Sequence, residues 1–126
     1  MKLIIQPTDY TCGQTCVAMV SGQPVDKVRK IFKEGFGKKH WFGEKTSTKD
    51  VVRALRILKV RSRRKINRLK KGETLPAFCI VRMRMPRVRW SHWVVFKNGD
   101  FFDPWFGKNP KDWPDRFRPT SYLELL

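Results

Sequence analysis

The first half of the chain carries apolar residues at helical spacing. Over residues 12–21 they occupy the i, i+4, i+7 and i+8 positions of one face, and Gly22 follows as a helix terminator. A similar stripe predicts a second helix over residues 25–34. A third helix is expected after Ser47, because Ser47 and Asp50 resemble a capping pair and an apolar stripe follows them.

The second half has a different pattern, in which short apolar runs are separated by turn residues. Residues 76–83 are apolar enough for a central strand. Residues 91–96 and 101–103 flank Asn98-Gly99, a pair that is typical of a two-residue hairpin turn. Helices followed by strands predict an α+β fold, and the length of the chain predicts one domain over residues 1–126.

Three further segments carry weaker signals. Residues 3–5 predict a short strand. The very basic residues 59–66 predict an edge strand, since charge is what exposed edges tolerate. Residues 104–126 begin with a proline-rich stretch and predict an irregular C-terminal extension.

The predicted hairpin brings two chemically useful residues to one face. A turn at Asn98-Gly99 sets Lys97 opposite Asp100. The period of two then makes His92 and Asp103 diagonal neighbours, roughly 7–8 Å apart at the backbone. Their side chains can close that gap to a hydrogen bond, as a base and its orienting acid require. A structural histidine and a strand-ending turn at Asp103 are the alternatives at this point.

Charge and cysteine content narrow the classes of function. Twenty-eight Lys and Arg against eleven Asp and Glu give a net charge of +17, which predicts attraction to nucleic acid, acidic proteins or anionic membrane. The three cysteines cannot all pair within one chain and form no Cys-x-x-Cys motif, so we expect neither disulfides, nor a metal, nor a cofactor. No stretch is long enough for a signal peptide or a membrane span, and we expect a cytoplasmic protein.

Cys12 lies where an irregular segment becomes the first predicted helix. The unpaired N–H groups at a helix N-terminus favour the thiolate, which is the nucleophilic form of cysteine. Gly13 is expected to leave room for a substrate, and the Gln6 amide can donate to an oxyanion. Cys16 and Cys79 are expected in the core. The alternatives for Cys12 are another buried thiol, or a metal site with Cys16 and a histidine.

Several short motifs, taken in order, resemble one peptidase family. Gln6 and then Asp9–Cys16 (Asp-Tyr-Thr-Cys-Gly-Gln-Thr-Cys) are similar to the nucleophile motif of the double-glycine-leader, or bacteriocin-processing, peptidases and their relatives, which are papain-like. The segment Gly43–Ser47 is similar to the stretch that precedes the third helix of that family. Ser91–Phe96 and Phe102–Pro104 are similar to its histidine strand and Asp-Pro hairpin.

The resemblance covers about residues 3–104 and implies a papain-like cysteine hydrolase, with the nucleophile at the start of the first helix and the helices packed on a C-terminal antiparallel sheet. It implies the roles of nucleophile for Cys12, base for His92, orienting acid for Asp103 and oxyanion donor for Gln6.

A peptide or protein is then the expected substrate, cleaved through a thioester. A glutamine deamidase or transamidase with the same triad is the first alternative. The second is a binding module with a relic triad, in which basic clusters over residues 61–71 and 82–89 bind nucleic acid or an acidic protein.

Overall fold

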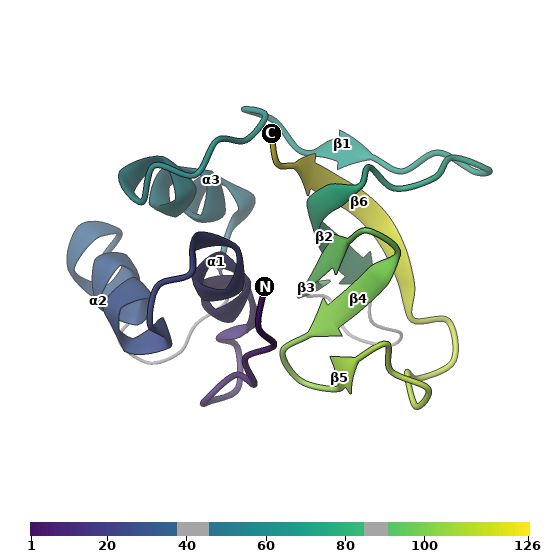
Figure 1. The fold of residues 1–126 in the computed structure, drawn as a ribbon, viewed down its shortest axis with the longest axis horizontal. Helices are drawn as coiled ribbons and strands as arrows, with labels where there is room; N and C mark the ends of the chain where they lie inside the picture. Colours follow the sequence, from purple (N-terminus) through teal and green to yellow (C-terminus); the bar gives the residue numbers. More distant parts are fainter. Residues whose placement is uncertain (38–45, 85–90) are drawn as a thin grey trace.

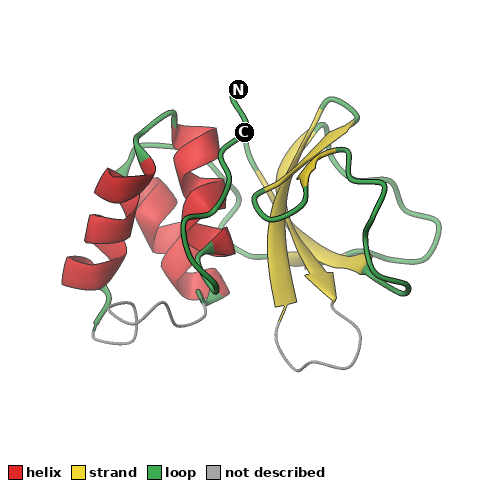
Figure 2. Ribbon diagram, turned by 90° about the horizontal axis from the view of Figure 1, so that it is seen from below, coloured by secondary structure: helices red, strands yellow, loops and turns green. Residues whose placement is uncertain are grey.

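The computed structural model describes residues 1–37, 46–84 and 91–126, and within them the chain forms a layer of three helices packed against a six-stranded sheet. Figures 1 and 2 show the helices gathered on one face of the sheet. This arrangement confirms the predicted α+β class. The helices are α1 (Cys12–Ser21), α2 (Val25–Gly35) and α3 (Thr48–Ile57), and the strands are β1 (Asn67–Arg68), β2 (Phe78–Arg84), β3 (Ser91–Lys97), β4 (Asp100–Asp103), β5 (Gly107–Lys108) and β6 (Arg118–Glu124).

Local signals set the ends of the helices. The backbone of Gly22 is left-handed, with φ of 71°, and this conformation ends α1 where the sequence predicts. The Ser47 hydroxyl accepts a hydrogen bond of 3.2 Å from the backbone N–H of Asp50, so the predicted capping pair starts α3.

The sheet is antiparallel throughout, in the order β1-β6-β2-β3-β4-β5. Between β3 and β4, Asn98 and Gly99 have φ of 50° and 88°, as a tight hairpin with both central residues at positive φ requires. Lys97 pairs with Asp100 in this hairpin, so the predicted register is confirmed.

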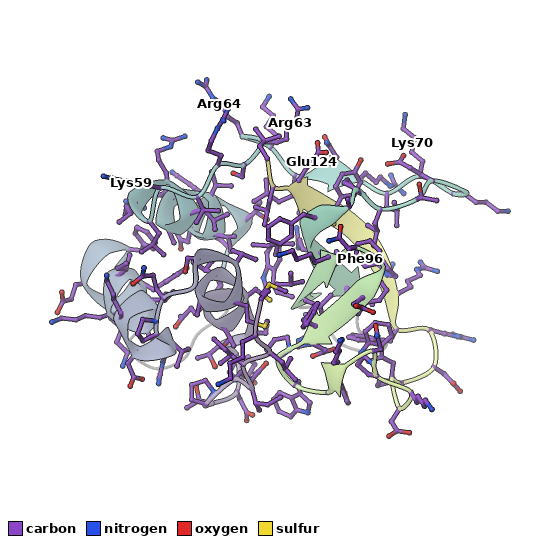
Figure 3. The ribbon with its side chains drawn as sticks, in the orientation of Figure 1. Lys59, Arg63, Arg64, Lys70, Phe96 and Glu124 are labelled. Carbon is purple, nitrogen blue, oxygen red and sulfur yellow. The ribbon has the colours of Figure 1, made fainter. Side chains whose placement is uncertain are left out.

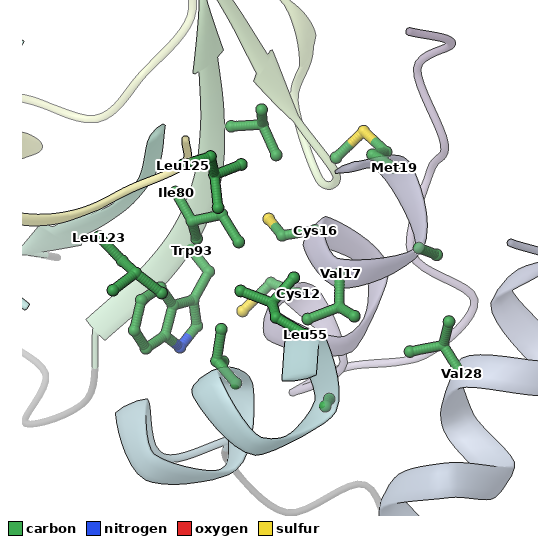
Figure 4. Close-up of a cluster of buried hydrophobic side chains, with 14 of the residues drawn as sticks. Cys12, Cys16, Val17, Met19, Val28, Leu55, Ile80, Trp93, Leu123 and Leu125 are labelled. Carbon is green, nitrogen blue, oxygen red and sulfur yellow. The ribbon is translucent and has the colours of Figure 1, made fainter. Parts of the chain in front are cut away.

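Helix α1 is the centre of the molecule. Its first eight residues, from Cys12 to Met19, are all buried, because α2, α3 and β3 pack around it. Figure 4 shows the thiols of Cys12 and Cys16 in the layer between this helix and the sheet. A Cβ added to Gly13 would come within 2.8 Å of the Thr46 side chain and 3.1 Å of Trp93. Gly13 therefore serves close packing, and the expectation that it leaves room for a substrate is wrong.

The C-terminal segment is part of the sheet, and the prediction that residues 104–126 are irregular is wrong. Strand β6 lies between β1 and β2, with Leu123 opposite Ile80. The register of β6 against β2 shifts where Met83 faces Pro119. A bulge of this kind accommodates proline inside a sheet, which is why the prolines do not prevent the strand.

Two other expectations about strands need correction. Residues 3–5 form no strand, although the backbone N–H of Gln6 donates to the Pro104 carbonyl at 2.7 Å. The basic segment 59–66 touches the sheet through an isolated bridge between Ser62 and Leu125, but it is not a strand. The edge strand is β1, which follows this segment.

Among the described residues, no helix is long and apolar enough to cross a membrane.

Candidate active site

Cys12 is the first residue of α1 and its side chain is 8% exposed. The turn before it is held by the Thr11 hydroxyl, which donates to the Thr8 carbonyl at 2.6 Å. The Thr11 carbonyl accepts the first helical hydrogen bond, from the N–H of Thr15 at 2.9 Å. The N–H groups of the first turn, including that of Cys12, have no carbonyl partner within the helix and point toward its N-terminal end.

The hairpin joins the two residues that the sequence places on one face. His92 Nε2 lies 2.6 Å from Asp103 Oδ1, so the predicted hydrogen bond is confirmed. Both side chains are buried, with 6% and 0% of their surface exposed. Cys12 lines the same pocket as His92 and contributes to the raised pKa of its ring. Because Nε2 faces Asp103, Nδ1 is the ring nitrogen left for the thiol.

Asp103 is held by the segment that follows it. Oδ1 accepts hydrogen bonds from the backbone N–H groups of Trp105 and Phe106, at 2.8 and 3.1 Å. Oδ2 accepts from the Trp113 indole at 2.8 Å. These donors fix the carboxylate and leave it ionised in a fully buried position.

The ionised forms of His92 and Asp103 stabilise each other. Burial alone lowers the pKa of His92, but the hydrogen bonds to Asp103 and Cys12 and the charges of these residues outweigh it and raise that pKa to about 9. Burial alone raises the pKa of Asp103, and the contacts with His92, Trp105 and Trp113 outweigh this effect and lower it. At neutral pH the pair is therefore an imidazolium next to a carboxylate.

Aromatic rings from the C-terminal segment cover the imidazole. The Phe106 and Phe117 ring centroids lie 6.3 and 5.7 Å from that of His92. The sequence analysis missed Phe106, Trp113 and Phe117, because it treated this segment as irregular. Leu123 and Leu125 lie two residues apart on either side of Glu124, and this period of two is the one weak signal of a strand there.

Gln6 lines the same pocket as Cys12 and His92. Its amide Nε2 donates one proton to the Thr8 carbonyl at 2.9 Å, and an amide carries a second. The pocket has a volume of about 770 Å³. Two large aromatic side chains on its wall are open to solvent, with Tyr10 43% and Trp105 51% exposed.

The other two cysteines lie in the core, as predicted. Cys16 is fully buried, and burial, followed by the charges of Cys12 and Asp103, raises the pKa of its thiol well above the ordinary value. Burial, followed by the charge of Glu124, raises the pKa of Cys79 to about 12. Both thiols are therefore protonated at neutral pH. In residues 1–37, 46–84 and 91–126, no three His, Cys, Asp or Glu side chains gather as metal ligands would.

The basic clusters are described in part. All of cluster 61–71 is described, and its cations are exposed. In cluster 82–89, Arg82 and Arg84 are described, whereas Arg87 and Arg89 lie outside the described residues, as do residues 43–45 of the family-like segment. Arg82 reaches the wall of the pocket, where its guanidinium donates to the Ser91 hydroxyl at 3.2 Å.

Comparisons with protein-family models, with curated proteins and with solved structures give no match for this chain.

Proposed function

We propose that this protein is a papain-like cysteine hydrolase that cleaves peptide bonds, with Cys12, His92 and Asp103 as its triad. One observation carries the proposal: a buried histidine lies 2.6 Å from a carboxylate and lines one pocket with a thiol at the start of a helix. A nucleophile, a base and an orienting acid in this order are what thiol acyl transfer requires. A central helix that starts at Cys12 and packs on an antiparallel sheet agrees with the papain-like fold that the sequence resemblance implies.

The ionic state of the triad suits the reaction. Since the pKa of His92 is about 9, the imidazole is protonated at neutral pH, and a positive charge beside Cys12 favours the nucleophilic form of a thiol. Among the described residues, Cys16 and Cys79 have no imidazolium partner, and burial holds both as thiols. Cys12 is therefore the proposed nucleophile.

In the first step, the Cys12 sulfur attacks the carbonyl carbon of the substrate and forms a C–S bond. The carbonyl oxygen becomes an oxyanion, for which the N–H of Cys12 and the second Gln6 amide proton are the proposed donors. His92 gives its proton to the leaving nitrogen as the C–N bond breaks, and a thioester forms.

In the second step, His92 takes a proton from water, and the hydroxide attacks the thioester carbon. The C–S bond breaks, which releases the carboxylic acid and restores the Cys12 thiolate. We favour a peptide bond as the substrate because the exposed Tyr10 and Trp105 offer apolar contacts for side chains of an extended chain. The same steps on a glutamine side chain would release ammonia instead, and product analysis separates the two outcomes.

The deciding experiment measures the reactivity of Cys12. The protein is alkylated with iodoacetamide between pH 5 and pH 9, and mass spectrometry locates the modified cysteine. Because an unperturbed thiol has a pKa of about 8.5, we expect Cys12 at pH 6 to react on the order of 10–100-fold faster than a free thiol. His92→Ala removes the proton donor to the thiolate and should abolish this advantage.

The chain supplies its own controls. Cys16 and Cys79 should stay unmodified in the native protein, since both are fully buried, whereas Cys12 is 8% exposed and lines the pocket. If Cys12 reacts no faster than these two, or if His92→Ala leaves its alkylation rate unchanged, the hydrolase proposal fails.

A further inference from the structure

A concave basic surface lies next to the pocket of the triad. This basic groove, with a volume of about 920 Å³, is formed by residues near β1 and at adjacent ends of β2 and β6. Figure 3 shows one of its residues, Lys70, on the segment that follows β1. The groove contains five exposed cations and a single acidic residue, Glu73, and its cations are Arg68, Lys70, Lys71, Arg84 and Arg118.

The charge of the groove is not neutralised within the described residues. The ion pairs that the structure describes lie elsewhere and include none of the five cations. Glu73 accepts a hydrogen bond from the Tyr122 hydroxyl at 2.8 Å, so its carboxylate has an uncharged partner.

Two of the cations face each other across the sheet. Arg84 on β2 and Arg118 on β6 are direct partners in the antiparallel register. Like charges in this position destabilise a sheet, so the fold retains a repulsion that an anionic ligand would relieve. This placement distinguishes the groove from a basic surface that is merely solvated.

The groove adjoins the pocket of the triad. Ser91 lines both cavities, and His92 follows it in β3. Arg82, which donates to the Ser91 hydroxyl, is two residues from Arg84 along β2. A chain that lies in the groove can therefore reach Cys12 without leaving the surface.

We propose that the basic groove binds an acidic segment of the polypeptide substrate while the bond to be cleaved lies at Cys12. This inference rests on the proposed function, because it makes the groove and the pocket two parts of one substrate site. Single-stranded nucleic acid is disfavoured, since no aromatic side chain for base stacking is among the described residues that line the groove.

A second basic hollow offers a matched control. It has a volume of about 670 Å³ and shares no described lining residue with the pocket of the triad. Arg56, Lys59 and Arg64 line it and are exposed. Figure 3 shows Lys59 and Arg64 near α3, away from Lys70.

The test compares two triple variants with equal loss of charge. The groove variant is Lys70→Gln, Arg84→Gln and Arg118→Gln, and the control variant is Arg56→Gln, Lys59→Gln and Arg64→Gln. The probe is an oligoglutamate of about ten residues, which spans roughly 33 Å when extended. Its binding is measured by fluorescence anisotropy at two salt concentrations in a Cys12→Ala background. We expect the groove variant to bind about tenfold more weakly, and the control variant to bind like the parent protein.

A second measurement connects the groove to Cys12. The oligoglutamate carries a bromoacetyl group at one end or the other, so that the Cys12 sulfur displaces bromide as a C–S bond forms. Bound peptide raises the local concentration of the reagent, and one of the two probes should alkylate Cys12 on the order of 100-fold faster than bromoacetamide. This advantage should disappear in the groove variant and persist in the control variant.

Three outcomes would overturn the inference. The first is that the groove variant and the control variant lose peptide binding equally. The second is that neither bromoacetyl probe alkylates a reactive Cys12 faster than bromoacetamide does, and the third is that a single-stranded DNA of equal charge binds more tightly than the peptide and displaces it. Failure of the proposed function is distinct from these, because it appears as an unreactive Cys12 toward iodoacetamide, whether or not the peptide binds.

Discussion

At the scale of single residues, Asp103 organises the candidate site. Its carboxylate is fully buried and accepts four hydrogen bonds, from His92, Trp105, Phe106 and Trp113. Because these contacts outweigh the effect of burial, the pKa of Asp103 lies below its ordinary value. A lowered carboxyl pKa contributes stability that is present above the unfolded pKa of 3.8 and is lost as the pH falls through the folded pKa.

The first prediction concerns Trp113, whose indole donates to Asp103 Oδ2 at 2.8 Å. Trp113→Phe keeps an aromatic ring but removes that donor. The folded pKa of Asp103 should rise, so acid unfolding should begin at higher pH. We expect the free energy of unfolding at neutral pH to fall by about 1–3 kcal/mol, the range for a hydrogen bond to a charged group. Urea unfolding at several pH values measures both effects.

Trp105→Phe is the matched control. The Trp105 side chain is 51% exposed, and Trp105 reaches Asp103 through its backbone N–H, which the substitution retains. Its effect on stability should stay within about 0.5 kcal/mol. Equal effects of the two substitutions at neutral pH, or an unchanged acid midpoint in Trp113→Phe, would contradict the role assigned to the Trp113 indole.

At the scale of elements, α1 depends on a glycine at its second position. The space beside Gly13 is filled by Thr46 and Trp93, whose indole donates to the Thr46 carbonyl at 3.2 Å. Gly13→Ala should therefore force the helix away from β3 and lower the free energy of unfolding by about 1–3 kcal/mol. It should also lower the alkylation rate of Cys12, since the shift moves Cys12 relative to His92.

Gly35→Ala tests whether the effect of Gly13→Ala comes from packing. Gly35 is the last residue of α2, and a Cβ added to it would meet no atom within 4 Å. Alanine in a helix with open space should be neutral or stabilise by up to about 1 kcal/mol. Urea unfolding followed by circular dichroism compares the two variants, and a smaller loss in Gly13→Ala than in Gly35→Ala would refute the packing argument.

Elements with local signals were predictable from the sequence, and elements made by distant contacts were not. A capping pair, a terminal glycine and an Asn-Gly turn act within a few residues, so α1, α3 and the hairpin that joins His92 to Asp103 could be predicted. Strand β6 depends on pairing with β2, some forty residues away, and on a bulge at Pro119 that no local pattern specifies. The hydrogen bond from the Trp113 indole to Asp103 was not predicted for the same reason, because only folding brings these two side chains together.

At the scale of the whole molecule, the C-terminal segment closes the fold. Strand β6 joins β1 to the rest of the sheet, and Leu123 on β6 and Leu125 just after it contribute to the core against the helices. On the other face, Phe117 and Trp113 pack against Val81, Val94 and their neighbours in a second apolar cluster. The segment thus supports both faces of the sheet that carries His92, and folding of the site should require it.

The last prediction compares two leucines of this segment. Leu123 is fully buried in the core between sheet and helices, whereas Leu126 is 60% exposed. Leu123→Ala leaves a cavity and should lower the free energy of unfolding by about 2–5 kcal/mol. Leu126→Ala keeps the backbone bond to the Arg61 carbonyl and should change it by less than about 0.5 kcal/mol. Urea unfolding measures both, with Leu123→Val as a milder variant if the alanine variant does not fold. Were Leu123→Ala no more destabilising than Leu126→Ala, β6 would not be a core strand, and the positions of Phe117 and Trp113 beside the triad would lose their support.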